Sequence, residues 1–95
     1  LTTTAGQIEA LKNPAANVRA LGFAALKAQG KKAIKPAKTL LASTNPYHQA
    51  RAVWLLSQLG DQGVAEVEKT LASRDERLRA TAYRAWCEVY RGEQI

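Results

Sequence analysis

The amino-acid sequence repeats itself every 30 residues without a gap. The positions that recur are Leu11, Leu41 and Leu71; Ala20, Ala50 and Ala80; Leu26, Leu56 and Trp86; and, in two copies, Gly30 and Gly60. Fixed periods of about 20–50 residues are typical of repeat proteins, in which each unit buries its apolar face against its neighbours. We therefore expect a single domain, 1–95, made of three units at about 5–30, 31–60 and 61–95.

Apolar residues recur at helical spacing throughout the chain, with no alternation typical of strands. This pattern predicts six helices, at about 5–12, 14–29, 32–42, 46–59, 62–72 and 74–91. The connections between them are short, and short connections join antiparallel helices into hairpins. The predicted fold is therefore all-α, an α–α superhelix of three stacked helix hairpins.

Residues that begin, end or pack helices lie at the expected places. We expect capping boxes at Thr4–Gln7 and Ser73–Glu76, N-caps at Asn13 and Asn45 ahead of a proline, and αL stops at Gly30 and Gly60. Small residues at one inward position, Gly22, Ala52 and Ala82, would allow close helix approach. Larger residues four positions later, Leu26, Leu56 and Trp86, would fill the space between layers.

Two segments, 11–26 and 73–82, resemble the HEAT repeat in its short bacterial form, which phycobilisome lyase-like proteins share. Val18-Arg19 and Leu78-Arg79 match the Val-Arg pair of that family. The middle unit departs from it, because His48-Gln49 takes this place and Arg51 lies two positions later. The resemblance implies a HEAT-like solenoid and a non-enzymatic scaffold that mediates protein–protein interaction. Since the chain has no Met and opens on Leu1, we expect it to be a fragment of a larger bacterial protein.

The segment 45–60 also resembles HEAT segments in secreted bacterial proteins that join a sugar-dehydrogenase-like propeller to a cytochrome c module. This likeness implies an accessory domain of a periplasmic haem or dehydrogenase protein. It favours a periplasmic or secreted location, with a cytoplasmic one left open. The chain has no Cys-x-x-Cys-His site for haem attachment, and no cofactor is expected.

The second helix of each hairpin usually lines the concave face of a HEAT-like solenoid. Helical phase places Ala24, Trp54 and Arg84 in one row across that face, opposite the buried stripe. The candidate binding residues are Tyr47, Trp54, Arg77 and Arg84, because exposed aromatic and arginine side chains are typical of binding hot spots. Arg84 would be able to form a cation–π pair with Trp54. The alternative is that Trp54 turns partly inward and fills a gap between units.

Arg19 and Arg79 lie beside the buried stripe at the same position of the repeat. We expect a structural role for both, in which each guanidinium bonds loop carbonyls or an acidic group in a turn between units.

Nothing in the sequence points to catalysis or to metal binding. His48, the only histidine, lies at the position of Val18 and Leu78, so we expect a half-buried, structural side chain without the further ligands that a metal site needs. Cys87 has basic neighbours, which can lower a thiol pKa, but no histidine to orient it. A lyase role like that of the phycobilin lyases therefore lacks the necessary acid–base or thiol geometry, and no small-molecule substrate is evident.

The net charge of +6 lies in the first half of the chain. Residues 1–45 carry seven Lys or Arg against Glu9, whereas residues 46–95 carry seven basic and seven acidic residues. A basic half favours a solvated lysine face or, as the alternative function, a nucleic-acid-binding surface. No apolar run approaches the length of a membrane-spanning helix, so membrane insertion is not expected.

Overall fold

The computed structural model of the chain describes residues 3–93. These residues form helices and no strand, which confirms the all-α prediction. The elements are α1 (Thr4–Lys12), α2 (Ala16–Gln29), the 3₁₀ helix η1 (Gly30–Ala33), α3 (Ile34–Leu41), α4 (Pro46–Ser57), α5 (Gly60–Thr70) and α6 (Glu76–Glu93). Residues 94 and 95, which the sequence assigns to the third unit, lie outside the described range.

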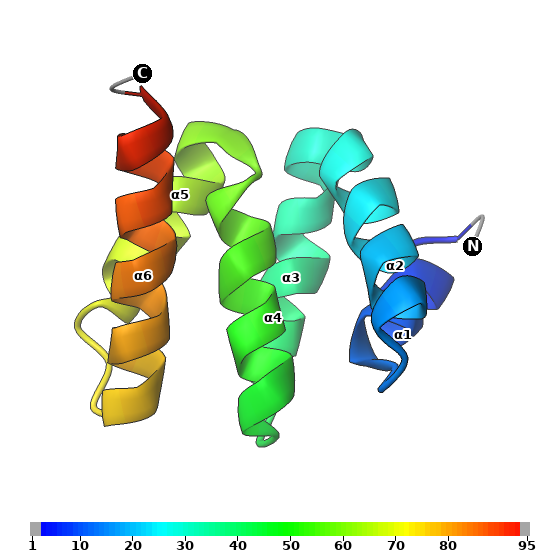
Figure 1. Ribbon diagram of the computed structural model, residues 1–95, viewed down its shortest axis with the longest axis horizontal. Helices are drawn as coiled ribbons and strands as arrows, with labels where there is room; N and C mark the ends of the chain where they lie inside the picture. Colours follow the sequence, from blue (N-terminus) through cyan, green and yellow to red (C-terminus); the bar gives the residue numbers. More distant parts are fainter. Residues whose placement is uncertain (1–2, 94–95) are drawn as a thin grey trace.

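The helices form two layers (Figure 1). In the view of Figure 1, α2, α4 and α6 lie in front, and α1, α3 and α5 lie behind them. The shortest dimension of the molecule is 22 Å, about twice the diameter of a helix with its side chains. Within the front layer α4 packs closely along α6 but only loosely along α2. The first hairpin is thus less tightly joined to the second than the second is to the third.

The core runs between the layers and contains the predicted repeat positions. Leu26, Leu56, Ala52 and Ala82 are completely buried, together with Val53, Leu55 and Val67. Trp86, at the repeat position of Leu56, is only partly buried and packs against the edge of this core. Large apolar residues at one position of the repeat therefore fill the space between layers, as the sequence indicated.

Glycine is needed at two positions, one where two helices approach closely and one where the backbone has a positive φ. A Cβ on Gly22 would lie 2.8 Å from the Gln7 carbonyl oxygen and 2.9 Å from the Ala10 Cβ, so glycine lets α1 and α2 approach closely. Gly30 has φ 61° and ψ −128°. The positive φ agrees with the predicted helix stop. The ψ value lies outside the αL region, so the αL assignment was wrong, and this combination of angles is one that only glycine populates readily.

The turns inside the hairpins share one hydrogen-bonding scheme, although the residue types that form it differ between turns. In each turn a side-chain oxygen accepts from the backbone N–H two residues later: Asn13 from Ala15, Ser43 from Asn45 and Ser73 from Asp75. Asn45 and Asp75 then cap the next helix, accepting from Tyr47 N–H at 2.9 Å and from Arg77 N–H at 2.9 Å. The N-cap positions 15, 45 and 75 are 30 residues apart. Asn13-Pro14 and Asn45-Pro46 therefore lie at different positions of the turn, and the start of the middle helix pair is not displaced.

The predicted caps at Thr4, Asn13 and Ser73 are therefore wrong. Thr3 caps α1 by accepting from the Gly6 N–H at 3.0 Å, because Thr4 is already the first residue of the helix. The Thr4 hydroxyl donates instead to the Gln29 side chain across the hairpin. Asn13 and Ser73 shape the turn instead of capping. Ala15, at the N-cap position of α2, makes no side-chain cap.

Several predicted boundaries also shift. The third helix begins with the 3₁₀ turn η1 because Pro36 has no N–H to donate to the Lys32 carbonyl. Helix α4 ends at Ser57 rather than at 59, since the next two N–H groups bond carbonyls three residues back. Helix α6 begins at Glu76, after its Asp75 cap, and continues to Glu93.

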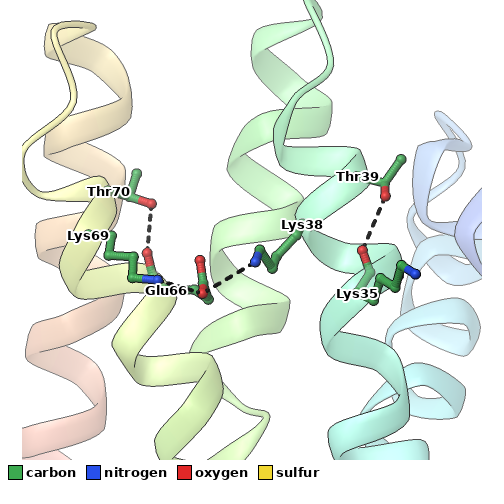
Figure 2. Close-up of polar contacts among 6 residues, drawn as sticks. All are labelled: Lys35, Lys38, Thr39, Glu66, Lys69 and Thr70. Carbon is green, nitrogen blue, oxygen red and sulfur yellow. Dashed lines mark hydrogen bonds and ion pairs between the residues drawn. The ribbon is translucent and has the colours of Figure 1, made fainter.

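The rear layer is linked by a shared carboxylate. Glu66 of α5 lies 3.6 Å from the Lys38 ammonium of α3 and 3.2 Å from that of Lys69 (Figure 2). The Thr70 hydroxyl donates to the Glu66 carbonyl in the same region. Since both lysine side chains are well exposed, these ion pairs contribute little to stability, and only the Lys38 pair joins the second hairpin to the third.

Candidate functional site

Two grooves separate the helices of the front layer, and Trp54 lines both. The N-terminal groove, of about 280 Å³, lies between α2 and α4 and is lined by Leu11, Ala16, Arg19, Ala20, Phe23, Arg51 and Trp54. The C-terminal groove, of about 300 Å³, lies between α4 and α6 and is lined by Trp54, Tyr83, Arg84, Cys87, Glu88 and Arg91. Trp54 is partly buried and packs against the core. Its indole therefore forms the ridge between the two grooves.

Of the predicted row of Ala24, Trp54 and Arg84, the last two line one groove, whereas Ala24 lines neither groove. Ala24 and Arg84 are exposed, whereas Trp54 turns partly inward, as the alternative interpretation had it. The reason is the loose packing of α4 on α2, which leaves space beside Trp54. Arg84 lines the same groove as Trp54, but no cation–π pair forms between them in the described part of the chain.

The other two candidate residues lie apart from these grooves. Tyr47 is 72% exposed at the start of α4 and lines neither of these two grooves. Arg77 lines a small cleft of about 20 Å³ between the starts of α4 and α6, with Pro46 and Leu78 among its neighbours. The structure thus brings Trp54 and Arg84 together and leaves Tyr47 and Arg77 near the opposite end of α4 and α6.

The guanidinium groups of Arg19 and Arg79 both contact carbonyls of the turn before their own helix. Arg19 Nη1 donates to the Asn13 and Pro14 carbonyls at 3.1 and 2.6 Å, and Arg79 Nη1 donates to the Ser73 carbonyl at 2.8 Å. These turns lie within a unit rather than between units. Such charge-assisted bonds hold the turn against the helix that follows it.

Arg51 makes the contact between units that the sequence analysis missed. Its Nη1 donates to the Leu11 carbonyl at the end of α1, 3.3 Å away and 40 residues earlier in the chain. Burial, and then the nearby charge of Arg19, lower the pKa of Arg51 below its ordinary value. The displacement of Arg51 by two positions from the family pattern was the sequence signal that this side chain has a different partner.

Polar chemistry in the C-terminal groove centres on Cys87. The side chain of Cys87, one helical turn away, interacts with the Tyr83 hydroxyl and raises the pKa of Tyr83 above its ordinary value. Glu88 lies beside these residues and pairs with Arg91 at 3.0 Å. The groove therefore presents an aromatic ring, two arginines and one carboxylate on the exposed side of α6.

Aromatic residues continue from this groove over the outer side of α6. The Trp86 ring lies 6.4 Å from Tyr83 and 4.5 Å from Tyr90 between ring centroids. Tyr83 is 59% exposed, although Val53 at the same repeat position one unit earlier is completely buried. The third unit thus exposes aromatic surface where the second unit is covered.

His48 lies half-buried near the start of α4, and its backbone N–H contacts the Asn45 cap at 3.4 Å. Within residues 3–93, no three His, Cys, Asp or Glu side chains come together as a metal site would require. None of the helices in this range is long and apolar enough to cross a membrane.

Comparisons with known proteins add no relative: no protein-family model matches the chain, and no curated protein matches it significantly.

Proposed function

We propose that this chain is a HEAT-like solenoid, a non-enzymatic scaffold within a larger bacterial protein, and that its α2–α4–α6 face binds a protein partner or a neighbouring domain. The repeated turn chemistry supports the solenoid, because the N-cap positions and the turn-shaping side chains recur at the 30-residue period. The stacking of like hairpins in two layers agrees with that architecture (Figure 1).

The observation that carries the binding role is the position of Trp54 on the ridge between two grooves. A partner that covers this face would contact the indole and could place side chains in both grooves. Tryptophan and arginine dominate the binding energy of many interfaces, and Arg84, Arg51 and Arg19 surround Trp54. Each groove lies at or below the lower end of the volumes typical of small-molecule sites, about 300–1,000 Å³, which favours partner side chains as occupants.

The experiment selects binders to the folded chain from a library of peptides displayed on phage and measures their affinity for variants. We expect Trp54→Ala and Arg84→Ala to lower the affinity of the selected binders by about tenfold or more, which is the usual effect of losing a hot-spot residue. Lys35→Ala, on an exposed side chain of α3 in the rear layer, is the matched control and should change nothing.

Circular dichroism would verify that Trp54→Ala folds. Arg84 is exposed, so its loss should change the free energy of unfolding by no more than about 0.5 kcal/mol. Binders that are insensitive to both front-layer variants would contradict the proposed face.

A nucleic-acid role is the second candidate, favoured by one observation. Lys27, Lys31, Lys32 and Lys35 are exposed around the end of α2, η1 and the start of α3, and none has an acidic partner within 4 Å in the described residues. Binding to duplex DNA that weakens steeply with added salt would support this role. Failure to bind DNA or heparin at low ionic strength would remove it.

A further inference from the structure

We propose that the N-terminal groove recognises a peptide segment of a partner protein in which an apolar side chain lies next to a carboxylate. This inference rests on the proposed protein-binding function and names the chemistry of the ligand. It follows from the lining of the groove, from its unbalanced charge and from the hydrogen-bond donors that its arginines keep free.

The lining of the groove is apolar on three sides. Leu11 forms part of the floor and is only 2% exposed, while Phe23 and Trp54 pack against the core from α2 and α4. Ala16 and Ala20 line the α2 side of the groove with short side chains. The groove volume of about 280 Å³ suits one or two inserted side chains rather than a cofactor. An apolar anchor would remove this surface from water and gain about 25 cal/mol per Å² buried.

The charge at the edge of the groove is not balanced. Arg19 and Arg51 lie close enough for the charge of one to lower the pKa of the other. The ion pairs within residues 3–93 involve Glu9, Glu66 and Glu88, and none of them includes either arginine. Glu9 is the only acidic residue before position 46 and already pairs with Lys12 at 3.1 Å.

The carbonyl contacts of the arginines do not cancel this charge. The end of a helix such as α1 carries about −0.5 elementary charge, against two full positive charges on Arg19 and Arg51. A guanidinium has five N–H donors in a fixed plane, and the bonds to the turn use only Nη1 of each side chain. These bonds hold both guanidiniums at the groove, where the remaining donors can receive a carboxylate.

A carboxylate bound between the arginines would relieve their repulsion and form charge-assisted hydrogen bonds beside the apolar pocket. An acidic side chain alone would leave the apolar floor uncovered, and an apolar side chain alone would leave the arginines repelling each other. A peptide with Asp or Glu beside Leu, Ile or Phe satisfies both surfaces. The C-terminal groove, which already contains Glu88, offers a weaker attraction to such a ligand.

The test uses a random peptide library displayed on phage, selected against the whole folded chain. We expect enrichment of peptides in which an acidic residue adjoins an apolar one. A synthetic copy of an enriched peptide and its amide version, with Asp→Asn or Glu→Gln, are then titrated against wild type, Arg51→Gln, Arg51→Lys and Arg19→Gln. Arg74→Gln, on an exposed side chain that lines neither groove, is the matched control.

Arg51→Gln and Arg19→Gln should each lower the affinity for the acidic peptide by about tenfold, because each removes one charge-assisted hydrogen bond. The same two variants should change the affinity for the amide version by less than about twofold. Arg51→Lys should restore part of the affinity for the acidic peptide. Binding of the acidic peptide should also weaken as salt is added. Circular dichroism would verify that the glutamine variants fold.

The inference would be overturned by no enrichment above background, by enriched peptides without acidic residues, or by equal losses for the acidic and amide peptides. Peptides that depend on Trp54 or Arg84 but ignore Arg51 and Arg19 would overturn this inference alone. Peptides that depend on none of these four residues would overturn the proposed function as well.

Discussion

At the scale of single residues, small side chains decide how closely the helices approach. Gly22 faces the backbone of α1, and the atoms that a Cβ would meet include the Gln7 carbonyl oxygen and the Leu11 nitrogen, 3.1 Å away. Backbone atoms cannot move aside as the end of a flexible side chain can. The first hairpin therefore depends on glycine at this position, even though glycine is a poor helix former.

We expect Gly22→Ala to lower the free energy of unfolding by about 1–2 kcal/mol. The steric cost of overpacking, about 1–3 kcal/mol, exceeds the gain of about 1 kcal/mol in helix propensity. The measurement is urea unfolding followed by circular dichroism. Gly6→Ala is the matched control within α1, because its Cβ would meet only the Thr3 hydroxyl at 3.1 Å. Equal effects of the two substitutions would contradict the close-approach argument.

At the scale of the helices, one N-cap position of the repeat has no capping side chain. Positions 45 and 75 carry Asn and Asp, which cap α4 and α6, whereas Ala15 leaves α2 without a side-chain cap. The backbone at Ala15 already has the extended conformation of an N-cap, with φ −76° and ψ 122°. Only the capping oxygen is missing.

We expect Ala15→Asp to raise the free energy of unfolding by about 0.5–1 kcal/mol, since a cap is worth about 1 kcal/mol. Conversely, Asn45→Ala and Asp75→Ala should each lower it by a similar amount. Thermal and urea unfolding would measure the changes. Ala24→Asp, exposed in the middle of α2, should give no gain, and a gain there as large as at position 15 would show that capping is not the cause.

At the scale of the whole molecule, the three hairpins are unequally joined. The contact of α4 with α6 is extensive, whereas α2 contacts α4 only slightly, across the N-terminal groove. The hydrogen bond from Arg51 to the Leu11 carbonyl is one of the few polar links from the first hairpin to α4. Regions with fewer buried contacts open at lower free energy than the rest of a protein.

Native-state hydrogen exchange should therefore show α1 and α2 opening before α4 to α6. Arg51→Gln should speed exchange in α1 and α2 while leaving α5 and α6 unchanged. Mass spectrometry of peptides from each hairpin would resolve the difference. Uniform protection across the three hairpins, or an Arg51 effect spread over all of them, would be the contrary result.

The helical content and the period were readable from the sequence because both depend on short-range spacing. Buried positions such as Leu26, Leu56 and Ala82 follow from helical phase and repeat register alone. The turn residues were harder, because Asn, Ser and Asp can each cap a helix or shape the turn before it. The sequence could not show that Asn13 and Asn45 have different roles.

The candidate site was only partly predictable for the same physical reason. Helical phase identified Trp54 and Arg84 as neighbours on the front layer, and the structure places them in one groove. The sequence by itself determined which residues lie on that layer. Only the tertiary structure decided that α2 stands away from α4, that Arg51 reaches across to α1 and that Trp54 turns inward. Those features depend on contacts between residues about 30–40 positions apart, which the sequence of a single unit does not specify.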